Sequence, residues 1–153
     1  MPRDLKSPSA SPCFATAIRK ASRRLSQLYD DALEPSGLRT TQFAILSELE
    51  RRAKEPPTMR ELADAMVMDR SALGRNLRPL ERDGLIALEE GEDRRQRRVV
   101  MTAHGEAKGR EAKRLWQTAQ DRFDEVFGKD AAADLRATLL GIAYDERLAG
   151  LRD

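Results

Sequence analysis

Apolar side chains recur every three or four positions through most of this chain, which is the spacing of a helix that buries one face. The first such run contains Phe14, Ile18, Ala21, Leu25, Leu28 and Ala32. It stops at Pro35-Ser36-Gly37, residue types that end helices. A second run carries Phe43, Leu46 and Leu49, with Thr40 as its expected N-cap. The pattern therefore predicts two amphipathic helices, preceded by a Ser/Pro-rich segment, 1–12, that we expect to be a flexible arm.

The middle of the chain predicts two short helices joined by a tight turn. Thr58 and Glu61 have the spacing of a capping box, which starts a helix through Leu62, Ala63 and Ala65. Asp69 can cap the next helix, which should end by Gly84 and whose apolar face is Leu73, Leu77 and Leu80. Pro79 lies inside it, where the missing amide is expected to kink or shorten the helix. Two helices so arranged, the second with arginines opposite its leucines, are typical of a helix-turn-helix.

A change from helical to strand periodicity follows. Residues 85–88 and 98–101 are short apolar runs on either side of a polar tip, 89–95, and predict a β-hairpin that would form a wing. Thr102 can cap a long helix with Leu115, Ala119, Phe123 and Val126, and a last helix follows Gly128 with Leu135, Leu139 and Ile142. The end helices carry more apolar face than this centre can cover. We therefore expect a two-fold dimer, with Trp116 in its core.

Length and composition exclude several classes of protein. The chain has 153 residues, enough for one domain, and 40% hydrophobic with 35% charged residues is not the composition of a disordered protein. No apolar run approaches the roughly 18 residues of a membrane helix, and the N-terminus lacks a signal-peptide pattern, so we expect a cytoplasmic protein without a membrane partner. Cys13 and His104 are the single residues of their types, too few for a zinc site, and we expect no metal or cofactor.

The net charge of +2 argues at first against a nucleic-acid partner, but the distribution of charge changes that conclusion. Residues 58–100 carry nine basic and nine acidic side chains whose signs are separated along the sequence. Two groups of arginines contain no acid, namely Arg70, Arg75 and Arg78, and then Arg94, Arg95, Arg97 and Arg98. Arginine suits bidentate contacts with guanine or phosphate and insertion into a narrow minor groove. Two solvated arginine faces are the alternative explanation.

Several blocks of sequence together resemble one family. They are Leu38-x-x-Thr41-Gln42-Phe43-x-x-Leu46, Leu62-Ala63, Ser71-Ala72-Leu73-x-Arg75-x-Leu77-x-x-Leu80-Glu81-Arg82-x-Gly84-Leu85-Ile86, Asp93-Arg94-Arg95 and Thr102-x-x-Gly105. In this order and spacing they look like a MarR-family transcriptional regulator. The resemblance implies a mainly α fold with a small β-hairpin wing, residues 13–153 as one domain, dimerisation helices over 13–36 and 102–153, and a winged helix-turn-helix over 40–101. It also implies a homodimer on palindromic double-stranded DNA, most often a repressor released by a small aromatic or phenolic ligand or by cysteine oxidation.

The family's DNA-reading positions can be carried over one at a time. Its recognition helix begins at Asp69, which places Arg70, Ser71, Gly74, Arg75 and Arg78 at the major groove; Gly74 stands where Thr or Ser is commoner. In the wing, Asp93 and Arg95 match an acid that orients an arginine entering the minor groove. Arg94, Arg97 and Arg98 are expected to reach phosphates or brace the hairpin. Thr41 and Arg60 stand near helix starts that can meet backbone phosphate.

The resemblance also suggests two ways of releasing DNA. A ligand cleft between the dimer helices and the winged lobe would be lined by Phe14, Ala17, Ile18, Phe43 and Leu46, although each of these also suits an ordinary core. Cys13, at the start of the first helix, where amides favour a thiolate, resembles the thiol of a peroxide-sensing branch. That branch places tyrosines where this chain has Ala17 and Thr40, with Tyr29 as the one substitute. We favour a structural role for Cys13 and keep a thiol-based redox-sensing repressor as an alternative.

Other classes fit the sequence less well. An enzyme would need a nucleophile–base pair, paired carboxylates or a phosphate-binding loop, and the sequence offers none of these motifs. His104 lacks ligand partners at metal spacing and is expected to face solvent, and the methionines are expected to fill core and turns. A helical adaptor would explain the amphipathic ends but not the acid-free arginine groups. An effector-independent architectural DNA-binding protein is the remaining alternative to a ligand-responsive regulator.

Overall fold

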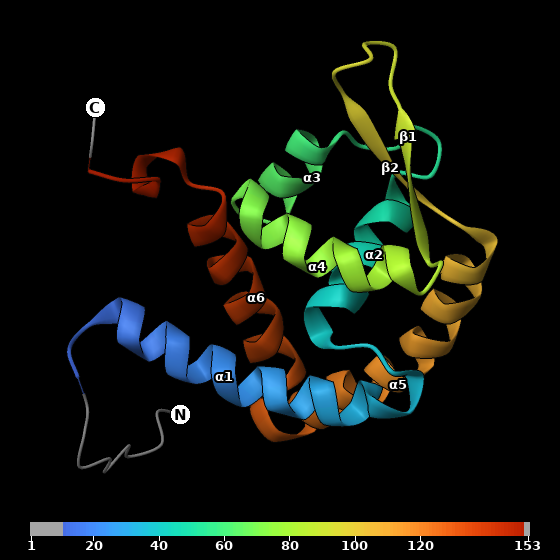
Figure 1. Ribbon diagram of the computed structural model, residues 1–153. Coiled ribbons are helices and arrows are strands. Elements are labelled where there is room, and N and C mark those ends of the chain that lie inside the picture. Colours follow the sequence, from blue (N-terminus) through green and yellow to red (C-terminus); the bar gives the residue numbers. More distant parts are fainter. Residues whose placement is uncertain (1–10, 152–153) are drawn as a thin grey trace.

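Local capping signals position most of the helices in the computed structural model, which describes residues 11–151 (Figure 1). Helix α3 (Met59–Ala65) opens with the predicted capping box, in which Glu61 N donates to Thr58 Oγ1 over 3.2 Å and Thr58 N donates to Glu61 Oε2 over 2.8 Å. Asp69 caps α4 (Arg70–Arg82) by accepting from Ala72 N over 2.7 Å. Thr102 caps α5 (Ala103–Phe127) in the same manner. Most of the predicted arm, residues 1–10, lies outside the described residues.

The first two helices follow the hydrophobic pattern, with one correction at a cap. Helix α1 (Phe14–Leu33) ends in a 3-10 turn, η1 (Glu34–Ser36), followed by Gly37 at a φ of 76°. Helix α2 (Thr40–Arg51) has Arg39 as its N-cap, one residue before the predicted Thr40. Thr40 is engaged elsewhere, because its amide and its hydroxyl both donate to Asp30 Oδ1 over 2.7 Å.

The core lies where α2, α3, α4 and the hairpin meet. Leu62, Leu73, Leu80 and Val99 are at most 1% exposed, together with Ile45 and Leu46 of α2. Helix α4 continues past Pro79 to Arg82, so the expected shortening does not occur. Leu77 and Leu80 are buried on either side of the proline, and this burial holds the helix against the core despite the missing amide.

The wing is a two-stranded antiparallel hairpin, as predicted, with longer strands. Strand β1 (Ile86–Glu90) pairs with β2 (Arg97–Met101) in the register Ile86↔Met101, so the tip is confined to 91–96. A bridge between Thr58 and Arg98, with Val99 N donating to Pro57 O over 2.9 Å, ties β2 to the segment before α3. The hairpin and the helix-turn-helix therefore form one lobe, and Figure 1 shows the hairpin on the side away from α1.

The remaining helices make up the rest of the molecule. Helix α5 packs against α1 and α2, and α6 (Lys129–Ala143) turns back from α5 at Gly128 before a last 3-10 turn, η2 (Glu146–Leu148). Ala112 and Ala119 of α5 are buried, whereas Leu140 and Ile142 of α6 are 50% and 42% exposed. Trp116, which we expected in the dimer core, is half-buried and packs within the chain against Phe43, with ring centroids 5.9 Å apart. None of the described helices is long and apolar enough to cross a membrane.

Candidate nucleic-acid interface and adjoining cavity

Helix α4 presents an exposed basic face opposite its buried leucines. Arg70, Arg75 and Arg78 are exposed, and within residues 11–151 none of them has an ion-pair partner. Ser71 is exposed on the same helix, and a Cβ placed on Gly74 would find no atom within 4 Å. Three guanidinium groups without carboxylate partners make this face able to bind an anionic surface.

The tip of the wing carries a second basic group. Arg94, Arg95 and Arg97 are exposed. The carboxylate of Asp93 accepts the backbone amide of Arg95 over 3.0 Å, so it shapes the turn that displays the Arg95 side chain. The resemblance implied that this acid orients the arginine, and the contact that the structure gives between the two residues is with the Arg95 backbone.

Arg98, Arg60 and Thr41 have distinct surroundings. The guanidinium of Arg98 donates to the carbonyl of Pro56, so Arg98 braces the hairpin against the segment before α3. Arg60 is exposed in the first turn of α3. Thr41 is half-buried beside Thr40, at the end of α2 that is bonded to α1. The structure therefore groups Arg60 with the lobe and leaves Thr41 at its junction with α1.

A cavity of about 1290 Å³ lies between the lobe and the helices α1, α5 and α6. Of the predicted cleft residues, Ala17, Ile18, Phe43 and Leu46 line it, whereas Phe14 does not and is 86% exposed. Its wall also includes residues that sequence reasoning did not assign to a cleft, namely Tyr29, Trp116, Met66, Val67, Leu139, Ile142 and Tyr144. The wall residues of α1 follow one another at steps of three or four positions, from Ile18 to Ser22, Leu25 and Tyr29, so helical spacing could have identified this face as part of the wall. No pattern in the neighbouring sequence indicates that α6 contributes to the wall.

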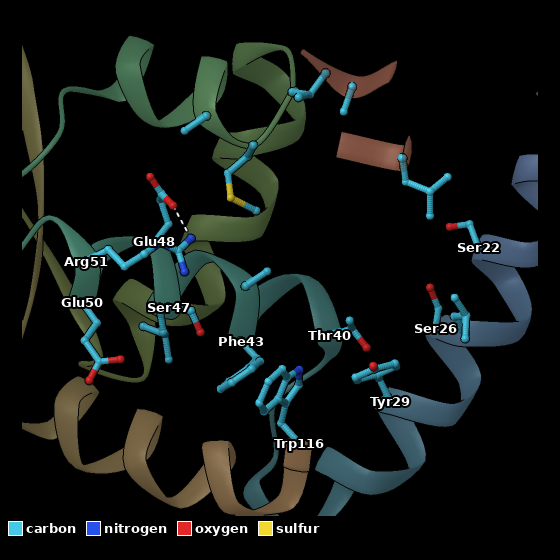
Figure 2. Close-up of a pocket in the computed structure, with 18 of the residues that line it drawn as sticks. Ser22, Ser26, Tyr29, Thr40, Phe43, Ser47, Glu48, Glu50, Arg51 and Trp116 are labelled. Carbon is cyan, nitrogen blue, oxygen red and sulfur yellow. Dashed lines mark hydrogen bonds and ion pairs between the residues drawn. The ribbon is translucent and has the colours of Figure 1, made fainter. Parts of the chain in front are cut away.

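Polar groups mark the margins of this mainly apolar cavity. Figure 2 shows Ser22, Ser26 and Tyr29 along α1, facing Phe43 and Trp116. The Tyr29 hydroxyl donates to Gln120 Oε1, and burial, followed by the charge of Asp124, raises the pKa of Tyr29. Burial acts to raise the pKa of Glu48, but hydrogen bonds from Arg51 and Arg52 outweigh it and hold that pKa below its ordinary value.

Cys13 and His104 complete the sequence candidates. Cys13 is exposed at the N-cap of α1, and hydrogen bonds from the Thr16 side chain and backbone lower the pKa of its thiol. His104 is exposed in the first turn of α5. In the part of the chain that the structure describes, no three His, Cys, Asp or Glu residues come together in a group that could hold a metal ion.

Comparison with known proteins gives the same family at several levels. A family model described as "MarR family" matches residues 36–96. Over 91 residues the chain is 30% identical to YwoH of Bacillus subtilis, an uncharacterized HTH-type transcriptional regulator; the match covers 60% of this chain and 65% of YwoH, slightly under two thirds of that relative.

Solved structures extend the similarity to nearly the whole chain. The Mycobacterium tuberculosis transcriptional regulator MosR in complex with DNA is 34% identical, with 91% of this chain and 99% of that chain covered and a TM-score of 0.80. The repressor CouR, of Rhodococcus jostii RHA1, bound to a 23-mer DNA duplex is 27% identical, with 92% and 99% covered and a TM-score of 0.79. CouR bound to p-coumaroyl-CoA is 25% identical, with 93% and 99% covered and a TM-score of 0.76.

Proposed function

The chain belongs to the MarR family of DNA-binding transcriptional regulators, and from this premise we propose that it is a cytoplasmic homodimeric repressor that binds a palindromic operator and leaves it when an aromatic or phenolic-type ligand fills the cavity. The observation that carries the proposal is the exposed face of α4, with three arginines that have no carboxylate partner within residues 11–151. A repressor needs such groups free to contact bases and phosphates.

Each residue of the interface has a proposed role. Arg70, Ser71, Gly74, Arg75 and Arg78 face the major groove, where a bidentate arginine–guanine contact gives about 1–3 kcal/mol of discrimination. Arg95 enters the minor groove from the wing, held by the turn that Asp93 stabilises. Phosphates are contacted by Arg94, Arg97, Arg60 and Thr41.

The apolar surface left on α1, α5 and α6 supports the homodimer. Leu140, Ile142, Val126 and Phe127 are between 42% and 50% exposed. Isolated exposed apolar residues are ordinary, but several on consecutive helices form the surface of a contact with another chain. A second copy covers this surface and brings two lobes together, which matches a palindromic site.

The cavity supports the ligand. Its apolar wall and polar margins suit a molecule with a flat hydrophobic part and a polar end. CouR, similar to this chain over nearly its full length, has been solved with an aromatic acyl thioester, p-coumaroyl-CoA. A panel of aromatic acids and their acyl thioesters should raise the unfolding midpoint, since a ligand at 100 times its Kd adds about 2.7 kcal/mol. Ala21→Phe, which adds a ring to the cavity wall from α1, should abolish this shift.

A selection experiment tests the DNA-binding interface. The purified chain should enrich a palindromic duplex from a random library, and gel-shift titrations with that duplex then compare variants. Arg75→Ala should weaken binding and relax base preference, and Arg95→Ala should weaken binding to sites with A·T-rich flanks. Arg82→Ala is the matched control, because Arg82 is also on α4 but is paired with Asp83 over 3.0 Å. Wild-type affinity in both Arg75→Ala and Arg95→Ala would contradict the assignment.

Cys13 supports a second candidate function, a thiol-based redox-sensing repressor. The thiol is exposed, and its pKa is lowered by Thr16, which favours the reactive thiolate. An organic hydroperoxide would oxidise the thiolate to a sulfenate and be reduced to the alcohol. The sulfenic acid would then condense with a low-molecular-weight thiol, or with the Cys13 thiol of a second protomer, to give a disulfide and water. Release of DNA by a hydroperoxide in the wild type but not in Cys13→Ser would support this function. Equal release in both proteins would contradict it.

A chain that keeps its DNA in the presence of both hydroperoxide and every ligand of the panel would instead be an architectural DNA-binding protein.

A further inference from the structure

The turn between α3 and α4 ends helix α3 in a Schellman arrangement. Val67 N donates to the carbonyl of Asp64 over 3.1 Å, and Met68 N donates to the carbonyl of Ala63 over 2.9 Å. Val67 adopts a left-handed conformation, with a φ of 52°, at the position where this motif usually places glycine. A β-branched residue is strained there, so the turn depends on the contacts around it.

One of those contacts comes from the far end of the chain. Tyr144, the residue after α6, donates its hydroxyl to the carbonyl oxygen of Ala65 over 2.7 Å, across 79 positions of sequence. Ala65 is the last residue of α3, and the final carbonyls of a helix have no partner within that helix. Tyr144 therefore supplies a hydrogen bond that completes the end of α3.

The same bond connects two walls of the cavity. Ala65, Met66 and Val67 line it from the helix-turn-helix, and Tyr144 lines it from the end of α6. Asp69, the N-cap of α4, follows Val67 by two positions. Tyr144 therefore links the end of α6 to the turn that precedes the helix carrying Arg70 and Arg75.

We propose that Tyr144 is a positioning residue for DNA recognition, and that its bond to Ala65 fixes the angle between the winged lobe and α6. In a homodimer this angle sets the distance between the two recognition helices, so the inference rests on the DNA-binding dimer proposed above. The described conformation, with the bond made, matches the DNA-bound structures of MosR and CouR with TM-scores of 0.80 and 0.79, slightly above the 0.76 of ligand-bound CouR, and we assign it to the DNA-competent state. An occupant that separates the cavity walls breaks the bond and lowers DNA affinity.

The chain offers a closely matched control for a test by mutation. It has two tyrosines, Tyr29 and Tyr144, and both line the cavity and donate their hydroxyls to an oxygen of a distant residue. The bond of Tyr29 joins α1 to α5 through Gln120, whereas the bond of Tyr144 joins α6 to the helix-turn-helix. Tyr144→Phe and Tyr29→Phe each remove a single oxygen and keep the ring.

The experiment compares three duplexes derived from the selected operator: the full palindrome, one half-site alone, and the palindrome with two base pairs inserted at its centre. Tyr144→Phe should bind the palindrome about 5- to 10-fold more weakly than the wild type, the effect expected when the dimer loses one exposed hydrogen bond in each protomer. It should bind the half-site as the wild type does. The two inserted base pairs should lower the DNA affinity of Tyr144→Phe by a smaller factor than that of the wild type, because the distance between its two lobes is less fixed. Tyr29→Phe should match the wild type on all three duplexes.

A second measurement follows the contact without DNA. Hydrogen exchange at the amides of Val67 and Met68 should be faster in Tyr144→Phe than in Tyr29→Phe, because the turn has lost its outside support. Wild-type affinity and spacing dependence in Tyr144→Phe would overturn the positioning role alone. An equal loss of affinity for the half-site and for the palindrome would also overturn the positioning role, since such a result would show that the substitution damages the winged lobe itself. A wild-type chain that enriches no duplex would overturn the proposed function together with the positioning role.

Discussion

A Cβ atom on Gly105 would lie 2.0 Å from the carbonyl oxygen of Leu85, so the first turn of α5 packs directly on the backbone where the hairpin begins. Thr102 reinforces this junction, because its amide donates to Leu85 O over 3.1 Å and its hydroxyl donates to Gly84 O over 2.6 Å. The winged lobe is thereby joined to the long helix through backbone groups.

We expect Gly105→Ala to lower the free energy of unfolding by about 1–3 kcal/mol, since the methyl group meets backbone that has to move. Urea unfolding measures the change. Gly109→Ala, one turn further along α5, is the control: a Cβ there meets no atom within 4 Å, and alanine should raise the free energy of unfolding by up to about 1 kcal/mol. Equal losses in the two variants would contradict the tight junction.

Val67→Gly should stabilise the protein. The left-handed backbone of Val67 costs an L-residue about 1–2 kcal/mol, and glycine removes this strain. Glycine also loses more backbone entropy on folding, which offsets about half of that stabilisation. We expect a net increase of about 0.5–1 kcal/mol in the free energy of unfolding, measured in urea. Met66→Gly changes the neighbouring residue, which has an ordinary φ of −87°, and should destabilise. A loss of stability in Val67→Gly would show that its side chain contributes more than its strain.

Stability should depend on pH through Glu48. The pKa of Glu48 is lower in the folded chain than in the unfolded chain, because bonds from Arg51 and Arg52 outweigh burial. Its contribution is therefore fully present above the unfolded pKa, near 4.5, and is lost as the pH falls through the folded pKa. Glu48→Gln should be less stable than the wild type at pH 7, and the difference should shrink toward pH 3. Urea unfolding across this range checks it, and a constant difference would contradict the assignment.

DNA affinity should fall steeply with salt. If each protomer of a dimer neutralises about four phosphates, the slope of log K against log salt is roughly −7. Arg97→Ala removes one phosphate contact from each lobe and should bring the slope to about −5. Fluorescence anisotropy between about 50 and 200 mM salt measures it. Arg136→Ala, an exposed arginine on α6, should leave the slope unchanged.

Sequence predicted the features that depend on neighbouring residues. Capping pairs such as Thr58 with Glu61 placed the helix starts, because both partners lie within one turn. The burial of Leu73, Leu77 and Leu80 followed from helical spacing alone. The distribution of charge picked out the two arginine groups, and the family resemblance assigned them to DNA-reading positions. The fold displays these arginines on one exposed face of α4 and at the wing tip.

Features built from distant segments could not be predicted in this way. The residues expected to line the cleft included none from α6, because no local pattern places Leu139 or Tyr144 opposite α3. The resemblance placed Phe14 in the cleft, but Phe14 is the first residue of α1, is 86% exposed and does not line the cavity. Val67 gave no turn signal, since its left-handed backbone is supported by bonds rather than by residue type.

Helix α5 has the length and continuity of a lever arm, because its 25 residues run without a break from the junction with the hairpin to the end that adjoins α6. At 1.5 Å per residue the lever is about 37 Å long, so a tilt of about 10° at one end displaces the other by about 6 Å. Neighbouring base pairs are about 3.4 Å apart, so this small tilt shifts a recognition helix by nearly two steps along the duplex. In the proposed ligand-released repressor, such a tilt would move the recognition helix off its half-site without unfolding any element.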